Sequence, residues 1–338
     1  MVQIINEKNL PSTLKNLEEI KNNIIHGDTL SFLKKIPEKS VNLIVTSPSY
    51  YTGKEYEEFK SFGDYLEKHE EIIKECYRVL KDNGAIFWNV AQTPIDGEII
   101  PLGAIFYNIF KKHNFFLKNW IIWKFEGGET PRKRFFGRYE NILWFVKNKD
   151  NYIFNLDSVR IPSKWISDKR CNPNGKNPED FWVFDERKNF EKIKTIKSKI
   201  LKYNLIFKQK SSQMNQALMN ELIRDIEIEL DNLINMEEMI KQRNLFDPIW
   251  HINRVVNISK SQKIKHPLNG KTHPCPFPEK MVERIIKVST NKGDFILDIF
   301  NGSGTTCKVA QELERDWIGI DKEKDYCEIA LKRVTSVI

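Results

Sequence analysis

The sequence predicts an α/β protein with a doubly wound, mostly parallel sheet and helices on both of its faces. Short apolar runs with the length of buried strands alternate with longer segments of helical periodicity. This alternation has the strand–helix–strand order of parallel crossover units. It stops near residue 150 and resumes near residue 279, so a region of different character is inserted between two halves of one sheet domain.

The first half alternates strand-like runs with helical segments. Apolar runs predict strands at residues 23–26, 41–45, 85–90, 120–125 and 142–146. Helical spacing predicts helices at residues 29–35, 64–80 and 101–113. Asp28 or Thr29 can cap the first helix, and Asp82-Asn83-Gly84 is expected to end the second. In such a sheet, ligands bind beyond the carboxyl ends of the strands.

The second half repeats the same alternation over a shorter length. Helices are expected at residues 279–288, 305–314 and about 326–334, and strands at residues 295–300 and 317–320. A glycine-containing turn, Asn301 to Thr306, follows the first of these strands. Asp321 follows the second strand.

The inserted region differs in composition from both halves. Turn-forming residues are frequent at residues 160–190. Residues 191–244 are predicted to form two long helices, and the second has an apolar stripe at spacings of three and four. The two helices could pair as a hairpin. A basic loop is expected at residues 246–270.

The bulk composition is that of a globular protein with a modest basic excess. Of the 338 residues, 40% are hydrophobic and 30% are charged, and lysine and arginine number 54 against 46 acidic residues, a formal charge of +8. This excess favours a polyanionic partner, although a lysine-rich surface that maintains solubility explains it equally well.

The cysteines and apolar runs exclude several protein classes. The five cysteines are widely spaced and include no Cys-x-x-Cys pair, so neither a disulfide framework nor a zinc site is expected, and no metal is expected. The first residues do not predict a secretory leader, and no run of about 20 apolar residues predicts a membrane span. The expected location is the cytoplasm, without membrane contact.

The turn after residues 295–300 has the features of a nucleoside site. Gly302 and Gly304 allow backbone N–H groups to approach a ligand at the start of a helix. Asp321 lies roughly 20 residues beyond the turn, at the end of the next strand, where an acid can accept hydrogen bonds from ribose hydroxyls. Each feature alone also fits a tight turn or a capping acid, but together they favour a nucleoside cofactor.

A second unusual stretch, Ser47-Pro48-Ser49-Tyr50, follows residues 41–45. With Phe300-Asn301-Gly302-Ser303-Gly304, it resembles the paired motifs of DNA amino-methyltransferases that use S-adenosyl-L-methionine. The family's catalytic motif is Asp/Asn/Ser-Pro-Pro-Tyr/Phe, and its cofactor motif is Phe-x-Gly-x-Gly. Ser49 departs from the catalytic motif, because the family has proline at that place. Residues 26–28, 138–145 and 273–278 resemble the family as well.

The catalytic motif precedes the cofactor motif here, which is the order of the family's beta class. The resemblance therefore implies a Rossmann-like methyltransferase fold in which residues 1–160 form the catalytic half and residues 271–338 the cofactor-binding half. Residues 161–270 would form a target-recognition region that contains the helical hairpin at about 191–244.

The proposed chemistry of the Ser47 motif follows from the substrate. An exocyclic base amine is a poor nucleophile because its lone pair is delocalised into the ring. The Ser47 hydroxyl oxygen and the Pro48 carbonyl can accept its hydrogens, and Tyr50 can stack on a base that has left the helix. The simpler alternative is a type I turn that closes a strand, with Tyr50 packed on the surface.

The remaining site residues are assigned by position and resemblance. The expected cofactor-binding residues are Asp28, Phe277, Asp298, Phe300, Gly302, Gly304, Thr305 and Asp321. Asp28 could equally serve as a helix cap. Expected DNA contacts are the basic residues Arg132, Lys133, Arg134, Arg138, Lys263 and Lys265.

The expected substrate is double-stranded DNA. In the resembling family, a serine in the first position of the motif goes mostly with cytosine N4 methylation, so Ser47 favours this product over N6-methyladenine. A site-specific enzyme of a restriction–modification system is implied, with a possible partner endonuclease and a monomeric or homodimeric state. Methylation of adenine or of RNA, a nicotinamide-dependent oxidoreductase and a non-catalytic DNA-binding protein are the alternatives. The missing third glycine of a dinucleotide motif disfavours the oxidoreductase.

Overall fold

The computed structural model describes residues 2–53, 59–125, 132–135, 137–161, 172–183 and 277–336. The chain divides into two compact units, and the larger one contains residues 1–159, 179–182 and 253–338. The sheet and its helices belong to this unit. The expected helical hairpin at residues 191–244 and the basic loop at residues 246–270 lie outside the described residues.

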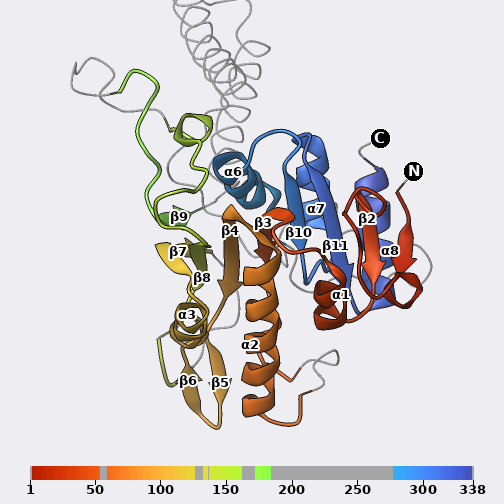
Figure 1. Ribbon diagram of the computed structural model, residues 1–338. Helices are drawn as coiled ribbons and strands as arrows, with labels where there is room; N and C mark the ends of the chain where they lie inside the picture. The colour runs from red at the N-terminus through yellow and green to blue at the C-terminus, as the bar shows by residue number, and fades with distance from the viewer. Residues whose placement is uncertain are drawn as a thin grey trace, which may run out of the picture. The chain divides into compact units, whose positions relative to one another are not determined.

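Nine strands within the described residues form one sheet, in the order β1-β2-β11-β10-β3-β4-β8-β7-β9 (Figure 1). These strands are β1 (Ile4–Asn6), β2 (Asn23–His26), β3 (Val41–Thr46), β4 (Leu80–Val90), β7 (Phe116–Lys124), β8 (Tyr139–Val146), β9 (Phe181–Val183), β10 (Phe295–Asp298) and β11 (Asp316–Asp321). Pairing is parallel from β1 to β4, whereas β8 runs antiparallel to both β4 and β7. The predicted mostly parallel sheet is therefore confirmed.

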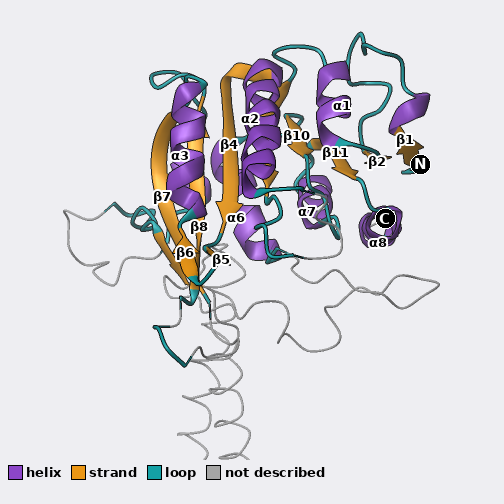
Figure 2. Ribbon diagram, turned by 90° about the horizontal axis from the view of Figure 1, so that it is seen from below, coloured by secondary structure: helices purple, strands orange, loops and turns teal. Residues whose placement is uncertain are grey.

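The helices cover both faces of the sheet, as expected for a doubly wound fold. The helices are α1 (Thr29–Lys35), α2 (Phe62–Val79), α3 (Leu102–Lys112), α6 (Glu279–Ser289), α7 (Thr305–Glu312) and α8 (Lys324–Thr335). Figure 2 shows α1, α2 and α3 on one face and α6, α7 and α8 on the other. Among the described residues, no helix combines the length and apolar character that crossing a membrane requires.

Three parts of the β structure were not predicted from the sequence. They are β1, the short edge strand β9, and a hairpin of β5 (Thr93–Ile95) and β6 (Glu98–Ile100) that pairs apart from the main sheet. β1 and β9 have three residues each, too few for a periodic pattern to be distinguished from a loop.

The expected end of the second helix at Asp82-Asn83-Gly84 is wrong. α2 ends at Val79, and Leu80 already has extended backbone angles and pairs with Val41. The next pair is Leu43 with Ala85, so three extra residues of β4 bulge between the two pairs. The bulge requires a glycine at position 84, because the Cβ atom of any other residue would lie only 2.9 Å from the Lys81 carbonyl oxygen.

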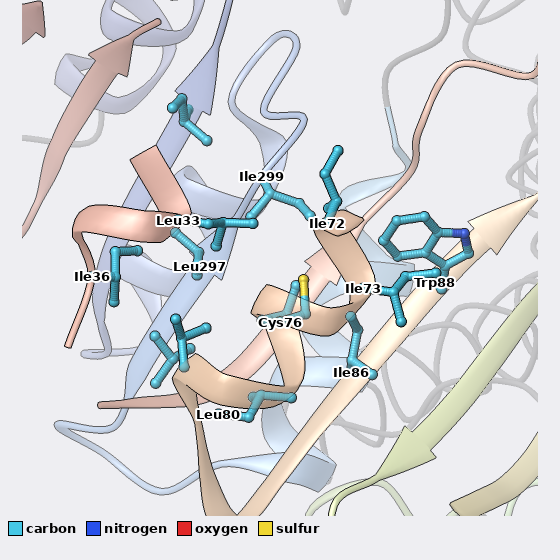
Figure 3. Packing of buried hydrophobic residues seen from close by; sticks show 14 of the residues in the cluster. Leu33, Ile36, Ile72, Ile73, Cys76, Leu80, Ile86, Trp88, Leu297 and Ile299 are labelled. Carbon is cyan, nitrogen blue, oxygen red and sulfur yellow. The ribbon is translucent and has the colours of Figure 1, made fainter. Parts of the chain in front are cut away.

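The core joins α1, α2 and α3 to the central strands, and Figure 3 shows part of it. Ile72, Ile73 and Cys76 of α2 are buried at helical spacing against Ile86 and Trp88 of β4. Burial of each large apolar side chain contributes about 1.5–3 kcal/mol. This apolar face therefore holds α2 against the sheet.

Candidate active site

The site lies where two neighbouring strands send their chains in opposite directions. β3 and β10 are parallel neighbours, with Leu43 opposite Ile296 and Ile44 opposite Leu297. From β3 the chain crosses through α2 to β4 on one side, and from β10 it crosses through α7 to β11 on the other. α2 and α7 cover opposite faces (Figure 2). Open α/β sheets bind their ligands at such a switch point.

Direct hydrogen bonds join the two motif segments across this switch point. The buried Thr46 hydroxyl donates to Asp298 Oδ1 at 2.8 Å, although the two residues are 252 positions apart. The Phe300 N–H lies 3.2 Å from both Thr46 Oγ1 and Asp298 Oδ1. The Ser47-Pro48-Ser49-Tyr50 segment and the glycine turn therefore begin at adjacent points of one sheet edge.

The Ser47 segment is held by a hydrogen-bonded network with residues of two strands, β4 and β8. Ser47 Oγ lies 2.9 Å from the Tyr50 hydroxyl and 3.1 Å from the Asn89 carbonyl oxygen. Tyr50 donates to Glu140 Oε2 at 2.8 Å. Asn89 Nδ2 donates both to the Tyr50 hydroxyl oxygen, at 2.8 Å, and to Glu140 Oε2, at 2.7 Å. Asn89 and Glu140 are buried, whereas Ser47 and Tyr50 keep partial exposure, so solvent reaches the two motif residues.

The third motif position is held from α2. The Tyr65 hydroxyl donates to the Ser49 carbonyl oxygen at 2.7 Å. The Tyr65 ring also packs on His69, whose ring lies 5.8 Å from the Phe300 ring. Burial lowers the pKa of His69 to about 4, so this imidazole is neutral at physiological pH and packs as an aromatic ring. An aromatic cluster on α2 thus supports both motif segments.

The glycine turn has the backbone conformation that its sequence predicts. Gly302 and Gly304 have positive φ angles of 50° and 75°, in the left-handed region. Gly304 also lies against α8, where an added Cβ would be 2.8 Å from the Cβ of Ala330. The Ser303 hydroxyl accepts from Arg333, which pairs with Glu279 at the start of α6. Positive φ and close packing together fix the shape of this turn.

Asp321 is bound to the same turn. Its Oδ2 accepts from the Gly302 N–H at 2.8 Å, and its Oδ1 accepts from the Glu323 N–H at 2.9 Å. Loss of hydration raises the pKa of Asp321 to about 6, although these two N–H groups oppose the rise. Burial likewise raises the pKa of Asp298 to about 6, against the hydrogen bonds from Thr46 and Phe300. Both carboxylates are therefore ionised above about pH 6.

The other expected cofactor residues lie around this edge. Asp28 caps α1 by accepting from the Ser31 N–H at 3.0 Å, and it pairs with Lys68 at 3.1 Å. Its neighbour Gly27 donates to the Asp321 carbonyl oxygen, which places the end of β2 beside the end of β11. Thr305 is buried at the start of α7, and the partly buried Phe277 immediately precedes α6. The capping role of Asp28 is thus observed.

The expected DNA contacts fall into two groups. Arg132, Lys133 and Arg134 are exposed in the connection between β7 and β8, and Arg138 is partly exposed. β7 runs parallel to β4 and β8 antiparallel, so this connection leaves from the edge that carries the Ser47 segment. Phe135 in the same connection is 99% exposed. Lys263 and Lys265 lie outside the described residues.

Three side chains of this arrangement were missed in the sequence. Asn89 and Glu140 interrupt apolar strand sequences near the edge that holds the site, and a buried polar residue there is a usable signal. Thr46 immediately precedes Ser47, and its hydroxyl joins the two motif segments. Within the described residues, no group of three or more histidine, cysteine, aspartate or glutamate side chains could hold a metal ion.

Comparisons with known proteins agree with this geometry. A family model described as DNA methylase, the N6/N4 type, matches residues 41–332. The type II methyltransferase M.BglII of Bacillus subtilis is 31% identical over 320 residues, covering 91% of this chain and 68% of that protein. The DNA adenine methyltransferase YhdJ of Escherichia coli (strain K12) is 29% identical, covering 92% of this chain and 82% of that protein.

Solved structures share the fold. The cytosine-N4-specific PvuII DNA methyltransferase superposes with a TM-score of 0.56 at 18% identity, covering 92% of this chain and 85% of that one. A putative DNA modification methylase of Thermus thermophilus, solved in complex with S-adenosyl-L-methionine, gives 0.52 at 20% identity and covers 93% of each chain. The family match leaves the nicotinamide-dependent alternative without support. The chain belongs to the N6/N4 DNA methylase family.

Proposed function

We propose that this protein is a site-specific DNA methyltransferase that methylates cytosine at N4 within a type II restriction–modification system. The observation that carries the proposal is the Thr46–Asp298 hydrogen bond, which brings the Ser47 segment and the glycine turn to one switch point. Membership in the DNA methylase family supplies the reaction class, and the methyl donor is S-adenosyl-L-methionine.

The glycine turn suits the donor's nucleoside moiety. With positive φ at Gly302 and Gly304, the turn has no side chains at its two glycine positions and leads into the start of α7. Asp321 can accept hydrogen bonds from ribose hydroxyls because a carboxylate has more acceptor sites than the two N–H groups occupy. Asp28, Phe277, Phe300 and Thr305 surround the same edge and would complete the cofactor site.

The Ser47 segment suits the target amine. When bound, S-adenosyl-L-methionine supplies an electrophilic methyl group. Ser47 Oγ and the Pro48 carbonyl would accept the two amine hydrogens and turn the nitrogen lone pair toward that methyl group. Tyr50, whose hydroxyl is held by Glu140 and Asn89, would present its ring to the flipped base. Alignment of the reacting atoms is the main contribution required of the protein.

The assignment to cytosine rests on Ser47, because the resembling family mostly has serine at this position when the product is N4-methylcytosine. YhdJ is named an adenine methyltransferase and PvuII a cytosine-N4-specific one, so relatives of both kinds exist. Adenine N6 therefore remains the second candidate. Both amines present two hydrogens, and Ser47 could accept from either.

DNA would bind along the sheet edge that carries the site. Arg132, Lys133, Arg134 and Arg138 would contact phosphates, and the exposed Phe135 beside them offers an aromatic face to bases. Residues 161–270, with Lys263 and Lys265, would form the target-recognition region between the catalytic half at residues 1–160 and the cofactor half at residues 271–338.

Methyl transfer itself tests this proposal. The protein is incubated with S-adenosyl-L-methionine labelled in the methyl group and with plasmid DNA, and the product is digested to nucleosides and separated by chromatography. Label in N4-methylcytosine is the expected result. Label in N6-methyladenine would overturn the cytosine assignment, and a purified, folded protein that labels no DNA would overturn the proposed activity.

A further inference from the structure

The hydrogen-bonded network behind Ser47 consists of Tyr50, Asn89 and Glu140. It contains more hydrogen-bonding groups than are needed to hold Tyr50 in place. Glu140 is 6% exposed and Asn89 is 2% exposed, and both lie on strands that pair with each other. Two donors, the Tyr50 hydroxyl and Asn89 Nδ2, converge on the same oxygen, Glu140 Oε2. A buried acid with this arrangement must influence where the hydrogens of its neighbours point.

Counting hydrogens gives their directions. A carboxylate only accepts, so the single hydrogen of the Tyr50 hydroxyl goes to Glu140. Asn89 Nδ2 donates a further hydrogen to the Tyr50 oxygen. No hydrogen of Tyr50 is left for Ser47, 2.9 Å away, so Ser47 must be the donor in that contact or else donate to the Asn89 carbonyl oxygen at 3.1 Å. In both cases the hydrogen of Ser47 is directed into the protein.

From this geometry we infer that Glu140 is a positioning residue that fixes the direction of the Ser47 hydroxyl through Tyr50. The inference rests on the proposed function, in which Ser47 Oγ accepts a hydrogen of the target amine. With the Tyr50 hydrogen on Glu140, the lone pairs of Ser47 Oγ remain available to that amine. Without an acceptor at position 140, the Tyr50 hydroxyl could donate to Ser47 Oγ, 2.9 Å away, and would then compete with the amine for the same oxygen.

Three variants separate this role from a structural one. Glu140→Leu removes the acceptor at similar size and is expected to lower kcat for methyl transfer by about tenfold or more. Glu140→Gln keeps a carbonyl oxygen for Tyr50 and Asn89 and is expected to stay within about threefold of the wild type. The double variant Tyr50→Phe/Glu140→Leu has no phenol hydrogen to misdirect, so its kcat is expected to match that of Tyr50→Phe alone.

The measurements are single-turnover and steady-state methyl transfer to plasmid DNA, the Kd for S-adenosyl-L-methionine by calorimetry, and Tm. The cofactor Kd is expected to be unchanged in all variants, because Glu140 touches none of the glycine turn. Wild-type kcat in Glu140→Leu would overturn the inference, as would equal losses in Glu140→Leu and Glu140→Gln.

If Glu140→Leu alone does not fold, the double variant still tests the inference, because it lacks both the phenol hydroxyl of Tyr50 and the carboxylate of Glu140. A kcat tenfold below that of Tyr50→Phe would contradict the inference. If the wild-type protein transfers no methyl group to DNA, the proposed function has failed, and this outcome is distinct from every variant result.

Discussion

The proposed site has a base side around Ser47 and a cofactor side around the Gly302 turn, and the two are built from different parts of the chain. On the base side, the Tyr50 hydroxyl is held by side chains of β4 and β8, and Ser47 Oγ lies within hydrogen-bond distance of that hydroxyl and of the Asn89 carbonyl oxygen. On the cofactor side, the glycine turn is placed by backbone conformation, and Asp321 is held by backbone N–H groups. The difference indicates that side-chain variants on the base side should alter turnover, whereas backbone changes on the cofactor side should alter binding.

The largest expected effect comes from Gly304→Ala. The added Cβ would lie 2.8 Å from Ala330, and alanine is strained at a φ of 75°. A distortion that costs about 2–3 kcal/mol would weaken S-adenosyl-L-methionine binding by about thirtyfold to a hundredfold. Calorimetric titration measures this loss. Gly97→Ala is the matched control, because Gly97 has a φ of 83° with no atom within 4 Å of the added Cβ. An unchanged Kd in Gly304→Ala would show that the backbone conformation of this turn does not control cofactor binding.

The next effect lies on the base side. Ser47→Ala removes one acceptor for the target amine and is expected to lower kcat by about tenfold to a hundredfold. The Kd for the cofactor should be unchanged, since Ser47 contacts only Tyr50 and Asn89 among the described partners. Ser49→Ala is the control, because its backbone carbonyl, not its side chain, accepts from Tyr65. A parallel loss of cofactor binding in Ser47→Ala would contradict the division into two sides.

The pH dependence of cofactor binding tests the role of Asp321 on the cofactor side. The pKa of Asp321 is raised to about 6, and in the proposed site ribose hydroxyls would bind its ionised form. Below about pH 6 the Asp321 carboxyl must lose a proton before it can bind the ribose hydroxyls. Cofactor affinity should therefore fall by up to about tenfold for each unit by which the pH is lowered. Above that pH the affinity should level off. Kd measured from pH 5 to 8 checks this, and Asp321→Asn should bind weakly without the same dependence. If Kd depends on pH equally in Asp321→Asn and in the wild type, the titrating group is not Asp321.

The smallest expected effect concerns DNA. Arg132→Ala should weaken binding to duplex DNA a few-fold and reduce the slope of log K against log salt by about one. Fluorescence anisotropy at several salt concentrations measures both quantities. Lys149→Ala is the control, because Lys149 is also exposed but follows the other end of β8. Equal effects of the two variants would mean that the basic connection does not face DNA.

The sequence predicted the cofactor side more completely than the base side. Gly302, Gly304 and Asp321 lie within one strand–turn–helix–strand unit, so their spacing along the chain already implies their proximity. Glu140 is 90 residues from Tyr50, and the contact depends on the antiparallel pairing of β4 with β8. No local pattern predicts that pairing. The bulge at Gly84 was missed for a similar reason, since a glycine after a helix usually ends it.

The most direct test is a crystal structure of the protein with bound S-adenosyl-L-methionine. We expect ribose hydroxyls on Asp321 and the donor's methyl carbon within roughly 6 Å of Ser47 Oγ, which is the span of one hydrogen bond plus one near-attack contact. A methyl group that points away from Ser47, or a cofactor bound elsewhere than the Gly302 turn, would contradict the claim that the two segments form one site.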